Sequence, residues 1–381
     1  MKCKLSDICC FRKGKVEVEN LNTKNYISTE NMLPNKSGIT EATSLPKVSS
    51  TQEYKNGDVL VSNIRPYFKK IWQARYDGGC SNDVLVFVPK STTDRDFLYY
   101  LLADDDFFTY SMATSKGTKM PRGDKTSIMQ YEVPMVDFCT QKKIASVLKS
   151  LDEKIELNNA INENLLNQAL TLYATQFSSL ELNGCIGDYC SVKSGFAFKS
   201  SWWTNCGVRV IKIGSINQDN LNLLECSYVD EDKADKAKDF VVKAGDLLIA
   251  MTGATIGKFA MVPYSSEVLL VNQRVGKFFL GNNPVEKLPF IYCTLKQPEV
   301  YGEVVNRGQG SAQPNISASD IMSIPCVIPS QDAINDFNDT SQPLFDLIIS
   351  NQQENQQLSE LRNVLLPKLM SGELDVSVID L

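Results

Sequence analysis

The chain has 381 residues, of which 43% are hydrophobic and 22% are charged. This length accommodates two domains of ordinary size, and the composition is that of a globular protein and excludes an intrinsically disordered chain. The sequence contains no histidine, which excludes Ser-His-Asp and Cys-His catalytic arrangements and histidine metal ligands. It lacks the roughly 18 to 20 consecutive apolar residues of a membrane span and the apolar core of a signal peptide, so we expect a cytoplasmic protein.

The net charge of −6 is concentrated in the last segment of the chain. Residues 331–381 hold two basic and nine acidic residues, which leaves 37 basic and 36 acidic residues in 1–330. A nearly neutral body can present a basic face, and binding to phosphates depends on that local field. The acidic total therefore does not exclude binding to a nucleic acid.

The eleven cysteines are scattered and never spaced as Cys-x-x-Cys. This pattern predicts buried thiols in a reducing compartment. Cys185, Cys190 and Cys206 lack the close ligand pairs of structural zinc sites, so we expect no metal. The segment Thr252–Lys258 only partly resembles a phosphate-binding loop, and we interpret it as a glycine turn between two strands.

Residues 1–140 are predicted to form a strand-rich first domain. Short apolar runs, 59–61 and 84–88, are bounded by Gly, Asp and Pro and predict strands. A helix is expected from Arg95 to Met112.

Residues 141–183 are predicted to form a central spacer helix. The segment from Gln141 to Phe177 has neither Gly nor Pro, which indicates a helix about 55 Å long at about 1.5 Å per residue. Its apolar residues recur every seven positions, which is typical of a coiled-coil seam. Two asparagines interrupt this seam, whose predicted members are Leu151, Ile155, Asn158, Asn162 and Leu165.

Residues 184–330 repeat the strand-rich pattern as a second domain, and residues 331–381 are predicted to form a second long helix and a tail. We expect a break at Gln342–Pro343 and a kink or end at Pro367. The predicted seam of this helix comprises Leu344, Ile348, Asn351, Asn355 and Leu358. The recurrence of asparagines at matching positions favours pairing between the two helices; the alternative is that these amides lie at a solvated helix edge.

The two halves of the chain are related by an internal repeat. The sequence Gly-Asp-Val-Leu-Val at 57–61 recurs as Gly-Asp-Leu-Leu-Ile at 245–249, an offset of 188 residues. A second match, from Gly117 to Gly310, has an offset of 193 residues, and this offset continues through the two long helices. The expected fold is therefore α+β, with two similar strand-rich domains, two long helices that form an antiparallel coiled coil, and an internal pseudo-twofold repeat.

Several segments, in this order and doubled, carry a resemblance that covers the whole chain. They are Gln141–Ala145, the Ser-Gly-Phe-Ala-Phe-Lys-Ser sequence at 194–200, the strand at 245–249, Gln273–Val275 and Leu365–Leu374. Together they resemble the specificity subunit of type I restriction-modification systems. The first half lacks a counterpart of 194–200, so the two recognition domains are expected to be of different subtypes.

The resemblance implies two target-recognition domains, each of which recognises one half of a split, asymmetric site in double-stranded DNA, with a coiled coil that sets the unread spacer. It also implies docking of two methyltransferase subunits, which bind S-adenosylmethionine, and of motor-nuclease subunits, which use ATP and Mg. The chain itself would be non-catalytic and without a cofactor, and it has no Asn-Pro-Pro-Tyr/Phe methyltransferase motif.

Recognition of bases requires side chains that reach base edges, Arg or Lys for guanine and Asn or Gln for adenine. In the first domain, two donor-rich clusters give the candidates Arg65, Tyr67, Lys69, Lys70, Lys116, Lys119, Arg122 and Lys125. In the second domain the candidates are Lys193, Lys199, Gln273, Arg274, Arg307, Gln309, Gln313 and Asn315, with Phe198, Trp202 and Trp203 as a groove-facing patch. Adjacent residues of a strand point to opposite faces, so at least one of the two tryptophans is expected in the core. The alternative for Lys69 and Lys70 is a solvated strand edge.

Two other functions remain open on the sequence. The first is a coiled-coil adaptor that binds only proteins, without direct readout of DNA. The second is an enzyme that uses Asp, Glu or Cys chemistry, which the missing motifs disfavour.

Overall fold

The computed structural model describes residues 2–308 and 314–376. The chain divides into two compact units. Unit 1 comprises Met1–Glu153 and Glu360–Leu381, and unit 2 comprises Lys154–Ser359. Each unit therefore takes part of both long helices, α5 (Phe138–Phe177) and α11 (Gln331–Ser371). The limits of the recognition domains within the units stay a prediction.

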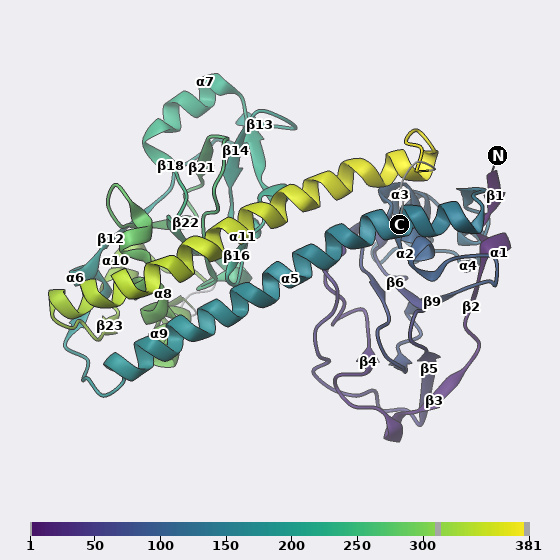
Figure 1. Cartoon of the computed structure of the whole chain (residues 1–381), viewed down its shortest axis with the longest axis horizontal. Helices are drawn as coiled ribbons and strands as arrows, with labels where there is room; N and C mark the ends of the chain where they lie inside the picture. The colour runs from purple at the N-terminus through teal and green to yellow at the C-terminus, as the bar shows by residue number, and fades with distance from the viewer. Residues whose placement is uncertain (1, 309–313, 377–381) are drawn as a thin grey trace. The chain divides into compact units, whose positions relative to one another are not determined.

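Unit 1 contains two four-stranded sheets (Figure 1). The first has the order β2-β9-β6-β7 and is antiparallel throughout, with strands Cys9–Phe11, Val84–Pro89, Val59–Ser62 and Ile71–Gln73. The second has the order β3-β5-β8-β4, with strands Lys15–Glu17, Ser50–Tyr54, Gly78–Cys80 and Tyr26–Ile27. Every residue of β6 is buried, which explains why its first three residues, Val59–Val61, are all apolar rather than alternating with polar residues.

Short helices complete unit 1: α1 (Leu5–Ile8), α2 (Arg95–Ala103), α3 (Asp105–Ala113) and α4 (Lys125–Ile128). Strands β1 (Lys2–Lys4) and β10 (Glu132–Pro134) pair antiparallel. The single helix expected from Arg95 to Met112 is wrong, because Asp104 has extended backbone angles between α2 and α3. Its side chain accepts a hydrogen bond from the amide of Asp106, so Asp104 caps the second helix instead of continuing the first.

Unit 2 repeats the first sheet of unit 1. The order β12-β22-β19-β20 matches β2-β9-β6-β7, again antiparallel throughout, with strands Ser191–Ser194, Val275–Phe279, Leu247–Ala250 and Phe259–Met261. Strand β19 is completely buried, like β6. The same strand order built from the matching sequence blocks confirms the predicted internal repeat.

The second sheet of unit 2 differs from that of unit 1. It has five strands in the order β13-β17-β14-β21-β18, which are Trp203–Thr204, Ser227–Val229, Val208–Ile211, Leu269–Val271 and Val241–Val242. Two strand pairs, β11-β23 and β15-β16, comprise Gly184–Cys185, Pro325–Cys326, Ile216–Asn217 and Asn220–Leu221. The helices are α6 (Ile186–Tyr189), α7 (Glu231–Ala234), α8 (Leu288–Lys296), α9 (Pro298–Gly308) and α10 (Ala318–Met322).

The two long helices pack antiparallel within each unit. In unit 1, Arg362 of α11 pairs with Asp152 of α5 at 2.5 Å. In unit 2, the amide of Asn351 lies opposite Asn162, at 2.8 Å. The prediction of two paired antiparallel helices, made from the seven-residue apolar pattern, is therefore confirmed.

The expected break of α11 at Gln342–Pro343 and its end at Pro367 are wrong, because the helix is continuous from Gln331 to Ser371, whereas a kink at Pro367 stays a prediction. A proline in a helix deprives the carbonyl four residues earlier of its partner. Here both prolines and the two residues that lose a partner, Asp339 and Asn363, are exposed, so water can hydrate the freed carbonyls.

Candidate nucleic-acid interface

In unit 1 the structure brings the two predicted basic clusters together at the end of β6. The Arg65 amide donates to the Pro121 carbonyl at 2.8 Å, and the Gly123 amide donates to the Asn63 carbonyl at 3.1 Å. Ile64 and Arg122 lie opposite each other between these bonds as an isolated antiparallel bridge. We call Asn63–Arg65 with Pro121–Gly123 the first junction.

Unit 2 has the same arrangement at the end of β19. The Gly253 amide donates to the Pro314 carbonyl at 3.0 Å, and the Ile316 amide donates to the Met251 carbonyl at 2.9 Å. Thr252 and Asn315 form the corresponding bridge. We call Met251–Gly253 with Pro314–Ile316 the second junction. Its residues follow those of the first junction by the offsets of 188 and 193 found in the sequence repeat.

A third segment joins each junction. The Asn63 amide donates to the Asp83 carbonyl at 2.8 Å, directly before β9. In unit 2 the Met251 amide donates to the Arg274 carbonyl at 3.0 Å, directly before β22. The two junctions therefore share one backbone frame, in which the side chains of Asp83 and Arg122 in unit 1 correspond to those of Arg274 and Asn315 in unit 2.

The turn after the first junction is held by an unusual backbone. Arg65 and Lys69 have φ values of 51° and 50°, in the left-handed region, on either side of the short 3₁₀ helix η2 (Pro66–Phe68). A non-glycine residue in this region costs about 1–2 kcal/mol, so surrounding contacts must maintain it. The loop before it contributes two of these contacts, because the amides of Asn35 and Lys36 donate to the carbonyls of Phe68 and Lys69 at 2.8 and 2.9 Å.

Asp105 of α3 fastens this turn electrostatically. Its carboxylate pairs with Lys36 at 2.7 Å and with Lys69 at 2.8 Å. Partial desolvation opposes ionisation of Asp105, whose side chain is 59% exposed, but the hydrogen bonds from the two lysines outweigh it and hold the pKa of Asp105 below its ordinary value. Burial also lowers the pKa of Lys36, despite the nearby carboxylate. Lys36 was missed from the sequence because it lies outside both basic clusters.

The other predicted DNA contacts of unit 1 differ in their exposure and in the partners they bind within the chain. Lys69 and Lys70 are half-buried rather than a solvated strand edge, and the Lys70 amino group donates to the Thr29 carbonyl at 2.6 Å. Lys116 pairs with Asp124 at 2.6 Å, and Arg122 pairs with Asp83 at 3.2 Å. The exposed candidates are Tyr67, Lys116, Lys119, Arg122 and Lys125. Tyr67 is 50% exposed and its ring lies 4.6 Å from that of Phe68, which gives this turn an aromatic tip.

In unit 2 the exposed candidates are Lys193, Lys199, Gln273, Arg274 and Asn315. Arg307 is engaged within the chain, because its guanidinium donates to the Ser323 hydroxyl at 2.7 Å and pairs with Glu303 at 3.0 Å. Gln309 and Gln313 lie outside the described residues. The contacts of these side chains with DNA stay a prediction.

The expectation that Phe198 faces a groove is wrong, because Phe198 is only 6% exposed and belongs to an apolar cluster with Trp202 and Trp203. Both tryptophans are half-buried and carry lysines on their rings. The Lys212 amino group lies 3.4 Å from the Trp203 ring centroid, and that of Lys236 lies 5.3 Å from the centroid of Trp202. Lys236 was missed because it lies among acidic residues in the sequence, and Lys212 was missed because it has no adjacent basic residue and so belongs to no basic cluster.

The predicted seam of the long helices contains a polar layer in unit 2. The Asn158 side-chain amide donates to Glu354 at 2.7 Å and to Asn355 at 2.9 Å. The solvated-edge alternative is contradicted for Asn158 and Asn351, which are 1% and 9% exposed. Around them Ile348 is buried, and the half-buried seam residues are Leu151, Ile155, Asn162, Leu165, Leu344, Asn355 and Leu358.

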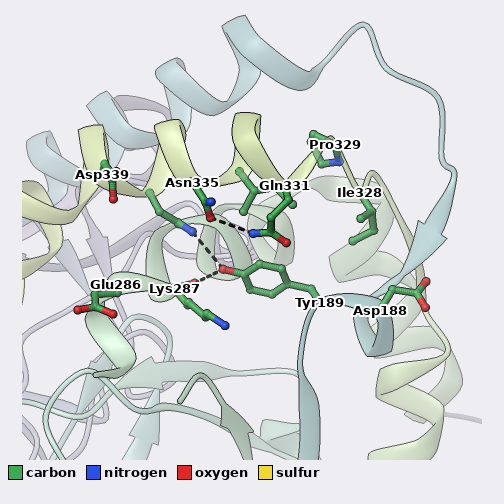
Figure 2. Close-up of a pocket in the computed structure, with 11 residues that line it drawn as sticks. Asp188, Tyr189, Glu286, Lys287, Ile328, Pro329, Gln331, Asn335 and Asp339 are labelled. Atoms are coloured by element: carbon green, nitrogen blue, oxygen red, sulfur yellow. Dashed lines mark hydrogen bonds between the residues drawn. The ribbon is translucent and has the colours of Figure 1, made fainter. Parts of the chain in front are cut away.

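A pocket of about 250 Å³ lies at the start of α11 in unit 2 (Figure 2). At its centre the Tyr189 hydroxyl donates to the Lys287 carbonyl at 2.7 Å and accepts from the Asn338 side-chain amide at 3.2 Å. The Asn338 side-chain oxygen accepts from the Phe290 amide at 2.9 Å. These bonds occupy the central polar groups and attach α11 to the rest of unit 2, which is a structural rather than a catalytic arrangement.

Within residues 2–308 and 314–376, no helix is long and apolar enough to cross a membrane. In the same residues no group of three or more Cys, Asp or Glu side chains is placed to hold a metal ion. The buried thiols include Cys80, and burial raises its pKa to about 12.

Comparison with known proteins agrees with this duplicated architecture. A family described as "Type I restriction modification DNA specificity domain" matches residues 1–167 and 182–360. The specificity subunit of the type I restriction enzyme MjaIX from Methanocaldococcus jannaschii is 26% identical over 314 residues, which cover 76% of this chain and 71% of the relative. The HindI specificity subunit from Haemophilus influenzae is 24% identical over 450 residues, covering 92% and 94%.

Among solved structures, the S subunit of a type I restriction-modification system from M. genitalium has a TM-score of 0.53 at 17% identity. The match covers 97% of this chain and 96% of that one, and it shows a shared fold. The sequence-based expectation of this family is confirmed, because the family match spans both halves of the repeat. The chain belongs to the family of type I restriction-modification DNA specificity proteins.

Proposed function

We propose that each unit recognises one half of a split, asymmetric DNA sequence on behalf of a type I restriction-modification complex. The observation that carries this proposal is the pair of junctions. They have the same backbone register but different side chains, with Arg65 and Arg122 in one and Gly253 and Asn315 in the other. A shared frame with different hydrogen-bond donors is suited to recognising two different half-sites at equivalent positions.

The paired long helices are proposed to set the unread spacer between the half-sites. The amide pairs Asn158–Asn355 and Asn162–Asn351 support this role, because polar pairs within a helix seam fix the register of one helix against the other. A fixed register means a fixed length, which is the property that a spacer requires.

Catalysis is assigned to partner subunits. Two methyltransferase subunits that bind S-adenosylmethionine, and motor-nuclease subunits that use ATP and Mg, would dock on this chain, which would itself hold no cofactor. Exposed apolar side chains on the long helices support the docking of proteins: Leu157 and Ile161 lie one turn apart on α5, and Leu347 is exposed on α11.

The test is methylome sequencing of a host that carries this gene with its neighbouring methyltransferase gene, with and without deletion of this chain. We expect adenine methylation at one split motif that disappears on deletion. A methylome that is unchanged by the deletion would contradict the proposal.

The exposed apolar residues also favour a second candidate, a protein-binding adaptor without direct readout of DNA. Bandshifts of the assembled complex distinguish the two. Direct recognition predicts binding to one bipartite site that falls steeply with salt, and loss of affinity when Arg274 and Asn315 are both changed to alanine. An adaptor predicts no effect of these two changes.

A further inference from the structure

The first junction carries two features that the fold does not require. Arg65 adopts left-handed backbone angles although it is not a glycine, with φ at 51°. Its structural equivalent in the second junction is Gly253, with φ at 73°, and a glycine adopts this conformation without strain. The same frame is therefore built in unit 2 at a lower conformational cost.

The second feature is a pair of buried polar atoms without a hydrogen-bond partner. Asn63 is 9% exposed, and both its Oδ1 atom and the Nε atom of Arg65 are buried and unpaired. In the second junction the equivalent of Asn63 is the apolar Met251, which packs in the core. An unpaired buried polar atom is costly, and the repeat shows that an apolar side chain satisfies the fold at this position.

The remaining contacts hold Arg65 rigidly. Its amide is bonded to Pro121, and Pro66, which is buried and has a fixed φ, follows it at the start of η2. A phosphate contact tolerates a mobile cation, whereas a bidentate contact with a base requires a guanidinium whose origin is fixed. Strained residues with unsatisfied groups, kept where the fold has a cheaper solution, are typical of functional positions.

We infer that Arg65 is a specificity-determining residue that contacts a guanine of the half-site recognised by unit 1. This inference rests on the proposed function. Guanine presents two acceptors, O6 and N7, in the major groove, and the planar guanidinium matches them with two parallel donors. Unit 2 has no side chain at the equivalent position, Gly253, so this particular guanine contact should belong to one half-site only.

The test compares Arg65→Gly with the matched control Lys69→Gly. Both substitutions remove one positive charge and relieve a left-handed backbone strain on the same turn. Lys69→Gly also removes one of the two ion pairs of Asp105, while Lys36 keeps the other. The full chain, assembled with its partner subunits, is titrated at one fixed salt concentration with its matched duplex. It is then titrated with duplexes changed at one base pair in turn across both half-sites.

For Arg65→Gly we expect discrimination at one G·C pair of one half-site to fall about 5- to 150-fold, which corresponds to about 1–3 kcal/mol for a bidentate base contact. Discrimination at the other pairs should be retained. The thermal midpoint should not fall, because glycine is suited to this conformation. Lys69→Gly should weaken binding to all duplexes by a similar factor and leave discrimination intact.

Three results would overturn the inference while the proposed function stands. Arg65→Gly could retain wild-type discrimination at every G·C pair, or it could lower affinity uniformly as Lys69→Gly does, or the recognised site could contain no discriminated G·C pair. A different result, equal binding of the wild-type assembly to every duplex, would refute the proposed function and the inference with it.

Discussion

The turn between β15 and β16 is attached to two helices of unit 2 by one residue, Asp219, and removing one bond to its carboxylate gives a quantitative test of the structure. The hydroxyl of Tyr292 on α8 donates to the Asp219 carboxylate, and Lys296 pairs with the same group at 2.5 Å. Gln352 of α11 donates to the Asp219 carbonyl at 2.9 Å. The predicted perturbation is Tyr292→Phe, which removes one hydroxyl and keeps the ring.

The expected destabilisation follows from the kind of bond lost. Tyr292 is completely buried, and a hydrogen bond to a charged group contributes about 1.5–3 kcal/mol. Water can reach the partly exposed Asp219 after the change, which favours the lower part of this range, about 2 kcal/mol. Two graded controls are available. Tyr173→Phe removes a neutral bond to Thr294, 3.0 Å long, and should cost about 1 kcal/mol, whereas Tyr264→Phe changes an exposed tyrosine of unit 2 and should cost close to zero.

Tryptophan fluorescence can isolate unit 2 in this experiment. The chain has three tryptophans, of which Trp72 belongs to unit 1 while Trp202 and Trp203 belong to unit 2. In a Trp72→Phe background, urea unfolding followed by fluorescence reports unit 2. A Tyr292→Phe variant within 0.5 kcal/mol of its parent (about the scatter of neutral surface changes), or no less stable than Tyr173→Phe, would show that the Asp219 bond does not stabilise unit 2.

Two further outcomes are expected. Gly195→Ala should destabilise unit 2 by about 1–3 kcal/mol, because the added Cβ would lie 2.3 Å from the Val271 carbonyl oxygen. The control is Gly214→Ala, because there is open space around Gly214. Equal thermal midpoints for the two variants would contradict this explanation. Asp105→Asn should lower the urea midpoint of unit 1 at pH 6. Because the pKa of Asp105 is lowered in the folded state, its contribution is present above the ordinary value of 3.8 and is lost as pH falls through the folded pKa. The difference from wild type should therefore shrink below pH 3.8, and a difference that does not change with pH would refute the assignment; Asp106→Asn, an exposed neighbour, is the control.

The sequence predicted which segments form the candidate site, but it did not predict the ion pairs and hydrogen bonds that its basic side chains make. The donor-rich segments around Arg65 and Arg122 were visible in the sequence, and the structure joins them at one junction. The bonds of Lys69 to Asp105 and of Arg307 to Ser323 were not, because those partners lie outside the elements of the two basic residues. The ion pair of Arg307 with Glu303, four residues earlier, lies within one helix. Whether a lysine amino group or guanidinium is available for DNA depends on such long-range neighbours, which composition and spacing do not encode.

By itself, the sequence determined the repeat, the long helices and their polar seam. These features are periodic or duplicated, so they can be recognised in the sequence without knowledge of the fold. The offsets of 188 and 193 residues reappear as identical hydrogen-bond registers at the two junctions. Only the tertiary structure decided that α11 runs through its prolines and that Phe198 is buried. It also decided that Arg65 takes the conformation that Gly253 has in the other unit. Each of these depends on solvent exposure or on contacts between distant segments, and those exist only once the chain has folded.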